Sequence, residues 1–588
     1  MDVDSASATA SIDPTTSISV PEGLRLHTEN TTHLLLSANE AFLNPVQEFN
    51  RDLSVACIRV WSEMREQERQ AKREAGRARK KAKVAKEGTS TKGTMDGEVG
   101  KETGETSQPA PLKATILEAL SATGLRAIRY AKEIPLASRV IANDLSPAAA
   151  EAIRRNVSIN GPLAQERVHV NQGDACALLY NHRSSPVDVV DLDPYGTAAP
   201  FVDGAVQAIR DGGLLCVTCT DLAVLATVNY PEKCYSNYGG VSVKADYCHE
   251  AALRLVLHSL ATAAARYGRA IEPLLSLSID FYVRVFVRVR YSAIGVKRLI
   301  GNTSTYYVCS FCQAHYGQTL GRVEEKTHQP SGNVNVSARV AQGPPVDGRC
   351  PECESKLHLA GPMWSGPLHD KFFVKEVLKH VEGSEEATPE AADAMRSTSA
   401  EGTEAAHAPA KATGVTTNSA AEAGDGDFKP KYGTAARMKG MLTVTSEELD
   451  IPFFFTPSRI AGTFHCITPS LDDITSAILH AGHAVSRSHA AAGSLKTTAS
   501  MRDLHDIFRA WISTHPVNRE KIAMGSPTVK LLDKEGSFQA NFKRHPDLAS
   551  ASSKVKLVRY QVNPTAGWGP GTKAGGKRKR GKEEKGEQ

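Results

Sequence analysis

The sequence predicts an α/β fold built around a doubly wound parallel sheet, followed by a smaller α+β domain. Strand-like and helix-like segments alternate between residues 114 and 267, and several strands are continuous apolar runs, as is typical of parallel strands buried on both faces. A chain of 588 residues with 41% hydrophobic and 23% charged residues is also long enough for two or three folded units.

The expected elements begin near Ala114. The first strand, helix and second strand form a βαβ unit, and the later apolar strands extend the same sheet. In chain order, we expect a strand at Thr115–Leu120, a helix at Ala127–Lys132, a strand at Arg139–Asn143, a helix at Ala148–Ile159, strands at Val168–Asn171, Val187–Leu192 and Gly213–Thr220, and a helix at Lys244–Tyr267.

Residues 277–291 alternate between apolar and other side chains, which indicates a β-strand with two different faces. The apolar side chains from Ile279 to Val289 share one face, and Arg284, Arg288 and Arg290 share the other. The arginine face either meets RNA phosphate or keeps its charges in water on a half-exposed antiparallel strand.

Acidic side chains stand at the ends of three successive predicted strands. Glu118 precedes a small-residue turn that ends at Gly124, Asp144 closes the next strand 20 residues after that glycine, and Asp174 follows the third strand. Small residues let the backbone approach a ligand, and an acid at this distance can accept hydrogen bonds from a ribose diol. Each feature alone also fits a tight turn or a helix cap. Together they favour a nucleoside cofactor, either NAD or S-adenosylmethionine.

The string Asp193-Pro194-Tyr195-Gly196 follows the fourth strand of this sheet. An exocyclic amine on an aromatic ring is a poor nucleophile, so a site that modifies one must hold its protons with acceptors. The Asp193 carboxylate and the Pro194 carbonyl are such acceptors, and the Tyr195 ring offers a surface on which a base can stack. The alternative is a strand that simply ends in a proline turn.

Two C-x-x-C pairs, Cys309 with Cys312 and Cys350 with Cys353, are separated by 37 residues. Four thiolates satisfy a tetrahedral zinc ion and leave no open position, so this zinc would be structural rather than catalytic. Unliganded cysteines are the alternative. Cys216-Val-Thr-Cys219 has the same spacing but lies in a predicted strand, where the two side chains point to opposite faces, so we expect core cysteines there.

The remaining segments differ in composition. The net charge is +5, but basic residues cluster at residues 65–86 and 577–580, which fits a phosphate backbone, a nuclear import receptor or a solvated run.

After residue 430, Ser470 and Asp473 resemble a helix capping box, and helix, strand and helix would fit a winged-helix-like module. We expect an unordered N-terminus at 1–20, a basic disordered insert at about 65–110, a polar inserted loop at about 327–345, a linker at 382–429, a C-terminal domain at 430–565 and a basic tail at 566–588.

The chain contains no apolar run of transmembrane length and no secretory segment, and its N-terminus is a poor match to a mitochondrial presequence. We therefore expect no membrane association and no disulfides, and a nuclear or cytosolic location is favoured.

Six strings taken together resemble the tRNA (guanine-26-N2) dimethyltransferase family, in its eukaryotic branch. The resemblance spans about residues 21–511 and is interrupted by three polar inserts. The strings are FLNPVQEFNRDL at 42–53, ALSATGLRAIR at 119–129, DPYG at 193–196, CYSNYGG at 234–240, GPMWSGPLHD at 361–370 and HCITPSL at 465–471.

The resemblance implies a Rossmann-like class I methyltransferase domain at 21–300, a zinc-knuckle region at 301–381 and a C-terminal domain that helps to hold tRNA. The implied reaction is methyl transfer from S-adenosylmethionine to N2 of guanine 26. A non-catalytic tRNA-binding protein on the same scaffold, or methylation of adenine N6, would be the alternatives.

The matching motifs also imply roles for individual residues. The methionine carboxylate would be contacted by Arg51 and Arg126, the ribose by Asp144, and the adenine by Asp174 and Ala175. Asp193 would orient the guanine amine, while Phe42 and Tyr195 would sandwich the flipped base. Tyr195 stands where the family often has Phe, so stacking is expected to persist.

Overall fold

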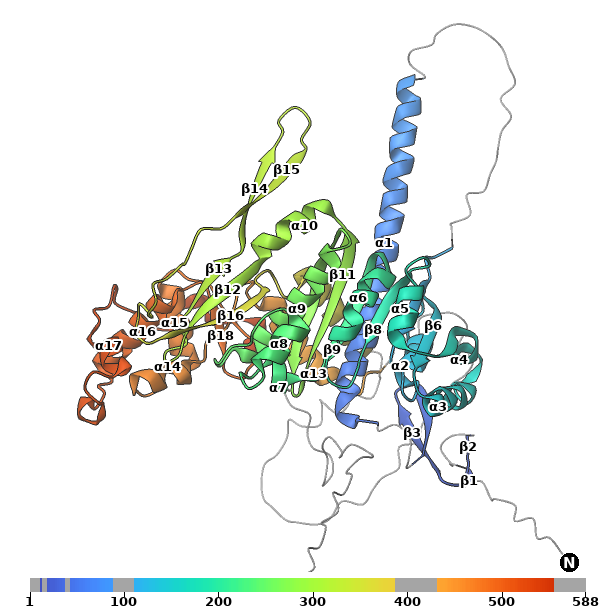
Figure 1. The fold of residues 1–588 in the computed structure, drawn as a ribbon, viewed down its shortest axis with the longest axis horizontal. Helices are drawn as coiled ribbons and strands as arrows, with labels where there is room; N and C mark the ends of the chain where they lie inside the picture. The colour runs from blue at the N-terminus through green and yellow to red at the C-terminus, as the bar shows by residue number, and fades with distance from the viewer. Residues whose placement is uncertain (1–10, 13–17, 38–42, 88–109, 386–430, 555–588) are drawn as a thin grey trace, which may run out of the picture.

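A seven-stranded sheet forms the centre of the computed structural model, which describes residues 11–12, 18–37, 43–87, 110–385 and 431–554 (Figure 1). The strand order is β10-β11-β9-β8-β5-β6-β7, and the five strands from β9 to β7 are parallel. This confirms the doubly wound sheet. The strands are β5 (Ala114–Glu118), β6 (Ala137–Asp144), β7 (Val168–Gln172), β8 (Val187–Leu192), β9 (Ile209–Cys219), β10 (Arg269–Ile279) and β11 (Tyr282–Tyr291).

The sheet is antiparallel at one edge, where β11 pairs with β9 and β10 pairs with β11. The single strand predicted for residues 277–291 is therefore wrong, because the chain turns at Asp280, whose φ is 43°, and at exposed Phe281. When the turn between two strands contains only two residues, the alternation of side chains continues through it, and the sequence alone suggests a single strand.

Helices cover both faces of the sheet, and two separate apolar clusters fill the spaces beneath them. Cys216 belongs to one cluster and Cys219 to the other, which confirms that these cysteines point to opposite faces of β9. One face carries α1 (Glu48–Glu87), α2 (Leu125–Glu133), α3 (Pro147–Ser158), α4 (Gly161–Arg167), α11 (Lys371–Glu385) and α13 (Ala435–Glu447), and the other carries α5 (Ala175–Asn181), α6 (Ala199–Ala208), α7 (Leu222–Leu225), α8 (Pro231–Tyr238) and α9 (Cys248–Ala265).

Helix α1 continues through residues 65–87, where the sequence predicted the start of a disordered insert. The buried first half of α1, which ends near Trp61, supplies the helical nucleus, and the following Ala, Gln, Glu, Lys and Arg residues are strong helix formers. Extending an existing helix needs no buried face, so the prediction was wrong for 65–87. Residues 88–109 lie outside the described residues.

The N-terminal part also contains strands. The sequence predicted an unordered segment at residues 1–20, but β1 (Ser11–Ile12) pairs with β2 (Ser19–Val20). A longer hairpin follows, formed by β3 (Leu24–Glu29) and β4 (Thr32–Ser37). Its Glu29 side chain is buried and receives ion pairs from α1 and α2, so the hairpin is tied to the helical face of the sheet.

A second, three-stranded sheet with the order β13-β12-β16 follows α10 (Ala293–Leu299). A β-hairpin replaces part of the polar loop predicted for residues 327–345, because β15 pairs along its length with β14. These strands are β12 (Thr303–Cys309), β13 (His315–Thr319), β14 (Gly321–Thr327), β15 (Val334–Val340) and β16 (Leu357–Trp364).

The C-terminal unit has its own apolar cluster, and its element order is the one expected of a winged helix: α13, a single bridge between Phe455 and Leu495, two helices and a hairpin. The capping box of Ser470 and Asp473 is present. The linker predicted at 382–429 and the tail at 566–588 lie almost wholly outside the described residues. The elements are α14 (Pro457–Phe464), α15 (Leu471–His480), β17 (Val485–Arg487), β18 (Leu495–Thr497), α16 (Met501–Thr514), α17 (Pro527–Asp533) and α18 (Ala551–Lys554).

A buried ionic cluster joins this unit to the sheet. Lys496 on β18 lies 3.2 Å from Glu250 on α9 and 3.0 Å from Glu448 at the end of α13, and all three side chains are at most 1% exposed. Glu250 also accepts bonds from Arg254. Burial alone would raise the pKa of Glu448, but its neighbours His489 and Lys496 hold it well below its usual range.

Two histidines beside this cluster close the open edge of β10. The backbone N–H of Ser276 donates to Nδ1 of His369, and that of Ser278 donates to Nε2 of His489. In a neutral imidazole the opposite nitrogen then carries the proton, and in both rings this nitrogen faces Glu448, at 3.7 Å and 2.6 Å. A metal ion would need lone pairs on those same nitrogens, so the group is a hydrogen-bonded cluster that seals the sheet edge.

The turn after β5 is built around a buried carboxyl group. Glu118 accepts from the Ser121 hydroxyl at 2.7 Å and from the Ala127 backbone N–H at 3.1 Å. Gly124 in this turn has a φ of 81°, and a Cβ there would lie 3.0 Å from Ile153. Burial raises the pKa of Glu118 to about 8 despite the hydrogen bond from Ser121. The acid predicted at this strand end is therefore turned inward, where it shapes the loop.

Replacing Lys496 by Met should leave two buried carboxylates without their shared cation. We expect Lys496→Met to lower the free energy of unfolding by about 3–5 kcal/mol, measured by urea denaturation. The matched control is Lys371→Met, which breaks a half-exposed pair with Asp450 and should cost less than about 1 kcal/mol. Equal losses in the two variants would contradict the role of the cluster.

The raised pKa of Glu118 predicts that Glu118→Gln becomes more stable relative to the wild type as the pH rises. In the wild type, the unfolded chain loses this proton near its ordinary pKa of 4.5 and the folded chain only near 8, so the stability that this group contributes falls as the pH rises between those values. The variant has no such proton. The free energy of unfolding of Glu118→Gln, relative to that of the wild type, should rise by about 2–4 kcal/mol from pH 5 to pH 8 in denaturation experiments.

Glu166→Gln, on the exposed surface of α4, is the matched control and should not reproduce this gain. A Glu118→Gln advantage that stays constant between pH 5 and pH 8 would show that Glu118 ionises normally in the folded chain.

Candidate active site

The turns that follow β5, β6 and β7 are connected to one another at the carboxyl edge of the sheet. The Ala122 backbone N–H donates to Asp144 at 2.9 Å, and the Asn143 side chain donates to the backbone carbonyls of Ala119 at 2.9 Å and Gly173 at 3.1 Å. The predicted site residues of these turns are therefore held at one edge. Parallel strands produce this arrangement, because their carboxyl ends face the same way.

Asp144 ends β6 and is partly exposed. Its two oxygens accept backbone N–H groups from Ala122 and from Ser146, each at 2.9 Å. A carboxylate has about four acceptor positions, so both oxygens can still accept bonds from the hydroxyl groups of a diol. The structure thus places Asp144 as predicted and shows what holds it there.

Asp174 and Ala175 begin α5. Asp174 is exposed and caps the helix by accepting the Ala177 backbone N–H at 2.8 Å, whereas Ala175 is buried. Asp174 is therefore a helix cap, and a capping carboxylate at the sheet edge still has lone pairs for a ligand.

Asp193 follows β8 and is clamped on one side by a buried guanidinium group. Nη2 of Arg126 donates to Oδ2 of Asp193 at 2.5 Å, and Nη1 donates to the Ser54 hydroxyl at 3.2 Å. The Asp193 side chain is 20% exposed, against 6% for Arg126. Within the described part of the chain, Oδ1 of Asp193 forms no hydrogen bond. One oxygen is thus fixed and the other is available to an N–H group.

The loop after Asp193 is anchored to the end of β9. The Gly196 backbone N–H donates to the Thr220 hydroxyl and the Thr220 backbone N–H donates to the Gly196 carbonyl, both at 2.8 Å. Pro194 is buried, while the neighbouring Tyr195 ring is 78% exposed. Desolvation of its hydroxyl, followed by the charges of Asp193 and Asp144, raises the pKa of Tyr195. An exposed ring therefore stands beside the carboxylates on a rigid loop.

Asp191, two residues before Asp193, organises the buried side of the site. It accepts from Arg284 at 2.8 Å and from the Tyr130 hydroxyl at 2.5 Å, and Arg126 lies 3.9 Å away. Burial would raise the pKa of Asp191, but Arg284 and Arg126 lower it below its usual range. Both alternatives for the arginine face of residues 277–291 are wrong for Arg284, which is fully buried because Asp191 neutralises it.

Arg51 belongs to a different ion-pair network. Its Nε and Nη2 donate to Glu29, which also receives Nη1 of Arg129 at 2.8 Å. These contacts outweigh burial and lower the pKa of Glu29 to about 2. In the described part of the chain, no hydrogen bond or ion pair joins Arg51 to Arg126, Asp144 or Asp193. Phe42, the other residue predicted from this segment, lies outside the described residues.

The structure brings in residues to which the sequence assigned no role at this site: Ser54 on α1, Tyr130 on α2 and Arg284 on β11. Their contacts with Arg126 and Asp191 join segments far apart in the chain, so no local spacing indicates them. Asp191 alone carried a sequence indication, because it stands in the string that ends in Asp193.

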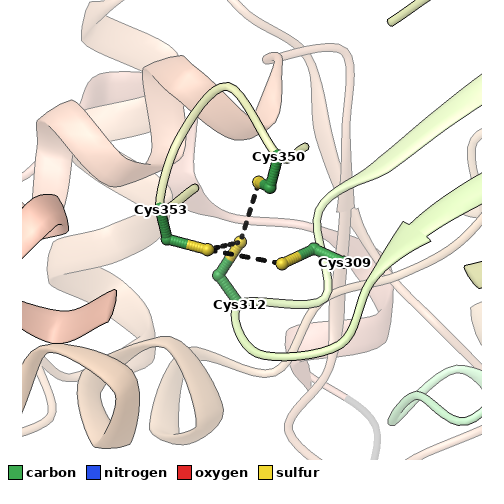
Figure 2. Close-up of side chains that lie close together, drawn as sticks. All are labelled: Cys309, Cys312, Cys350 and Cys353. Atoms are coloured by element: carbon green, nitrogen blue, oxygen red, sulfur yellow. Dashed lines mark hydrogen bonds between the residues drawn. The ribbon is translucent and has the colours of Figure 1, made fainter. Parts of the chain in front are cut away.

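The four predicted cysteines form a compact cluster (Figure 2). The Sγ atoms of Cys309 and Cys353 are 3.3 Å apart, and Cys312 lies 3.7 Å from both Cys350 and Cys353. All four are buried and none is in a disulfide. Thiolates around one tetrahedral zinc ion are separated by about 3.8 Å, so the cluster has the size needed to hold such an ion.

The two cysteine pairs have the same backbone shape. The residue after the second cysteine of each pair has a left-handed conformation, with φ of 61° at Gln313 and 60° at Glu354. Two matching turns that aim four thiols at one point are expected of a knuckle pair built around a metal ion. The same cysteines pack into the apolar cluster of the C-terminal unit, so the knuckles connect that unit to the second sheet.

Comparison with known proteins agrees with this geometry. The model of the family described as N2,N2-dimethylguanosine tRNA methyltransferase matches residues 23–409 and 412–509. A tRNA (guanine(26)-N(2))-dimethyltransferase of Schizosaccharomyces pombe is 41% identical over 544 residues, covering 91% of this chain and 90% of that protein. The mitochondrial tRNA (guanine(26)-N(2))-dimethyltransferase of Saccharomyces cerevisiae is 40% identical over 570 residues, covering 93% and 92%.

Among solved structures, Trm1 from Pyrococcus horikoshii, determined with S-adenosyl-L-methionine, aligns with a TM-score of 0.55 at 22% identity. The alignment covers 84% of this chain and all of that chain, which shows a shared fold. Because the family model matches most of this chain, the chain belongs to the N2,N2-dimethylguanosine tRNA methyltransferase family.

Proposed function

We propose that this protein transfers methyl groups from S-adenosyl-L-methionine to the exocyclic N2 of guanine 26 in tRNA, forming N2,N2-dimethylguanosine. The observation that carries this proposal is the Asp193 carboxylate, which has one oxygen held by Arg126 and the other directed to no partner among the described residues. Family membership supplies the substrate class, and the site supplies the acceptor that the reaction needs.

Asp193 acts on the amine rather than on the methyl group. The amine lone pair is delocalised into the guanine ring, so the reaction requires the N–H protons to be held while nitrogen turns toward the donor. Oδ1 of Asp193 and the Pro194 carbonyl accept those protons, and Asp193 takes up the proton released as the N–C bond forms. The second transfer uses the one remaining N–H in the same way, so the pocket must also accept a methyl group.

The base is held by stacking. The exposed Tyr195 ring supplies one surface, and the family resemblance suggests Phe42 for the other. A fixed loop between Asp193 and Gly196 keeps the ring and the carboxylate in one orientation. A flipped guanine can then reach both at once.

The residues at the sheet edge fit the methyl donor. The donor, when bound, supplies a methyl group on a sulfonium, which needs no metal activation. Asp144 has acceptor positions for the ribose hydroxyls, and for the adenine we propose Asp174 and Ala175, which begin α5 at the same edge. For the methionine carboxylate we propose Arg126, which is already at this edge, together with Arg51, which is tied to Glu29.

We propose a structural zinc ion for Cys309, Cys312, Cys350 and Cys353. Four buried thiols at these separations match the donor set and size of a closed zinc site. Since the cluster packs into the C-terminal unit, zinc would stabilise the part of the protein that we expect to hold tRNA.

We propose a nuclear location, with a further cytosolic or mitochondrial pool. The proposal rests on the basic segment at residues 577–580. Among the described residues, no helix is both long and apolar enough to cross a membrane.

Asp193→Ala should reduce turnover by roughly 10²–10⁴-fold, because the amine loses its proton acceptor. Binding of tRNA should stay near the wild-type level, since one side chain leaves the RNA contacts elsewhere intact. The measurement is methyl incorporation from labelled S-adenosylmethionine into unmodified tRNA, followed by nuclease digestion to identify the nucleoside. Asp547→Ala, at an exposed position, is the control. A fully active Asp193→Ala, or label on adenosine, would contradict the proposal.

Metal analysis tests the zinc site. Protein purified without chelators should contain about one zinc ion per chain, and Cys309→Ser should lose most of it together with the thermal stability of the C-terminal unit. Cys176→Ser, outside the cluster, should retain both. Wild-type protein free of zinc would refute the assignment.

A further inference from the structure

The outer half of α1 leaves the body of the protein as a rigid arm (Figure 1). Three contacts hold its base: Arg65 with Asp188 at 2.8 Å, Glu66 with the Leu112 backbone N–H at 2.9 Å, and Glu68 with Arg288 at 3.1 Å. Asp188 and Arg288 belong to β8 and β11 of the central sheet. The sheet therefore sets the direction in which the helix projects.

The arm is strongly basic beyond this base. Between residues 72 and 80 it carries five cationic side chains and one acid, all of them exposed. None of the five forms an ion pair within the described part of the chain. Helical spacing places positions 65, 69, 72, 79 and 80 within one face of the helix. The five cations are Lys72, Arg73, Arg77, Arg79 and Lys80.

A cleft of about 210 Å³ lies where this basic face meets the end of β11. Arg65, Glu68, Arg69 and Lys72 line it from the arm, Arg288 and Arg290 line it from β11, and Asp211 lines it from β9. The buried Nε atoms of Arg69 and Arg288 have no partner among the described residues. The lining thus carries five cations and two acids, so two segments more than 200 residues apart build a surface of net positive charge.

This surface is remote from the reacting edge. Asp188 stands at the start of β8 and Asp193 follows its end. The cleft therefore lies at the amino ends of the parallel strands, opposite the carboxyl ends where Asp193 stands. The strand separates them by roughly 16 Å, and the arm from Glu68 to Lys80 adds roughly 18 Å in another direction. A ligand that touches both places must be long.

We propose that the arm and the cleft bind the phosphodiester backbone of the tRNA at a distance from the methylated base. The inference rests on tRNA being the substrate and goes beyond it by assigning a second contact surface. Unpaired cations on a fixed helix complement phosphate charge without reading sequence. An import signal would be a linear segment, and it would not need Arg288 and Arg290 from the folded sheet.

The test is a charge-reversal variant, Lys72→Glu with Arg79→Glu and Lys80→Glu, in the full chain. Its matched control is Arg139→Glu with Arg154→Glu and Arg183→Glu, which changes the same charge at exposed positions elsewhere on the methyltransferase domain. The dissociation constant for an unmodified tRNA transcript is measured at several salt concentrations. We expect the arm variant to bind at least roughly tenfold more weakly. The slope of log affinity against log salt concentration should also become shallower by about two to three.

A shortened RNA separates this surface from the active site. A hairpin limited to the stems that flank guanine 26 should bind wild type and arm variant equally, because it does not reach the arm. Equal thermal melting of the variants shows that folding is intact. Unchanged affinity and salt dependence with full tRNA would overturn the proposal, as would an equal loss of affinity for the hairpin. Loss of nuclear accumulation with unchanged tRNA affinity would also overturn it and assign the arm to an import receptor.

Discussion

The guanidinium group of Arg126 lies between two carboxylates, Asp191 and Asp193, and the reactive edge depends on this contact. Without a cation there, two acids at the end of one strand would repel each other and the Asp193 side chain would have no fixed orientation. Ser54 on α1 holds both Arg126 and Arg284, so the long helix and the antiparallel edge of the sheet take part in positioning the same carboxylate. Four separate elements thereby meet at one acceptor oxygen.

A second buried charge, at the open edge of β10, joins the C-terminal unit to the central sheet. At β10 the histidine rings of His369 and His489 close the strand edge. Glu448 lies 2.6 Å from the His489 ring and 3.7 Å from the His369 ring, and Lys496 neutralises it. The C-terminal unit is thus fixed to the methyltransferase domain by polar contacts of defined geometry together with apolar side chains such as Phe453 and Met438, which belong to the two apolar clusters of the sheet. A unit attached in this way keeps a constant position relative to Asp193.

Much of the sheet could be predicted from sequence, because buried parallel strands are apolar runs that depend little on their neighbours. The bounds predicted for Val187–Leu192 are those of β8, so the string that begins with Asp193 stands at the end of a strand, as the sequence predicted. The β10–β11 hairpin and the roles of Arg284 and Ser54 could not be predicted, since they depend on contacts between distant segments. The arm of α1 was missed because composition alone does not reveal that ion pairs such as Arg65 with Asp188 hold its base.

The central claim is that Asp193 holds the guanine amine. The most direct measurement is the distance between the Asp193 carboxylate and N2 of guanine 26 in a solved complex with tRNA and S-adenosylhomocysteine. The account predicts an Asp193 oxygen within hydrogen-bonding distance of N2, about 2.7–3.2 Å, with the sulfur of the cofactor product on the far side of that nitrogen. A complex in which N2 is held by another residue, with Asp193 bound only to Arg126, would contradict it.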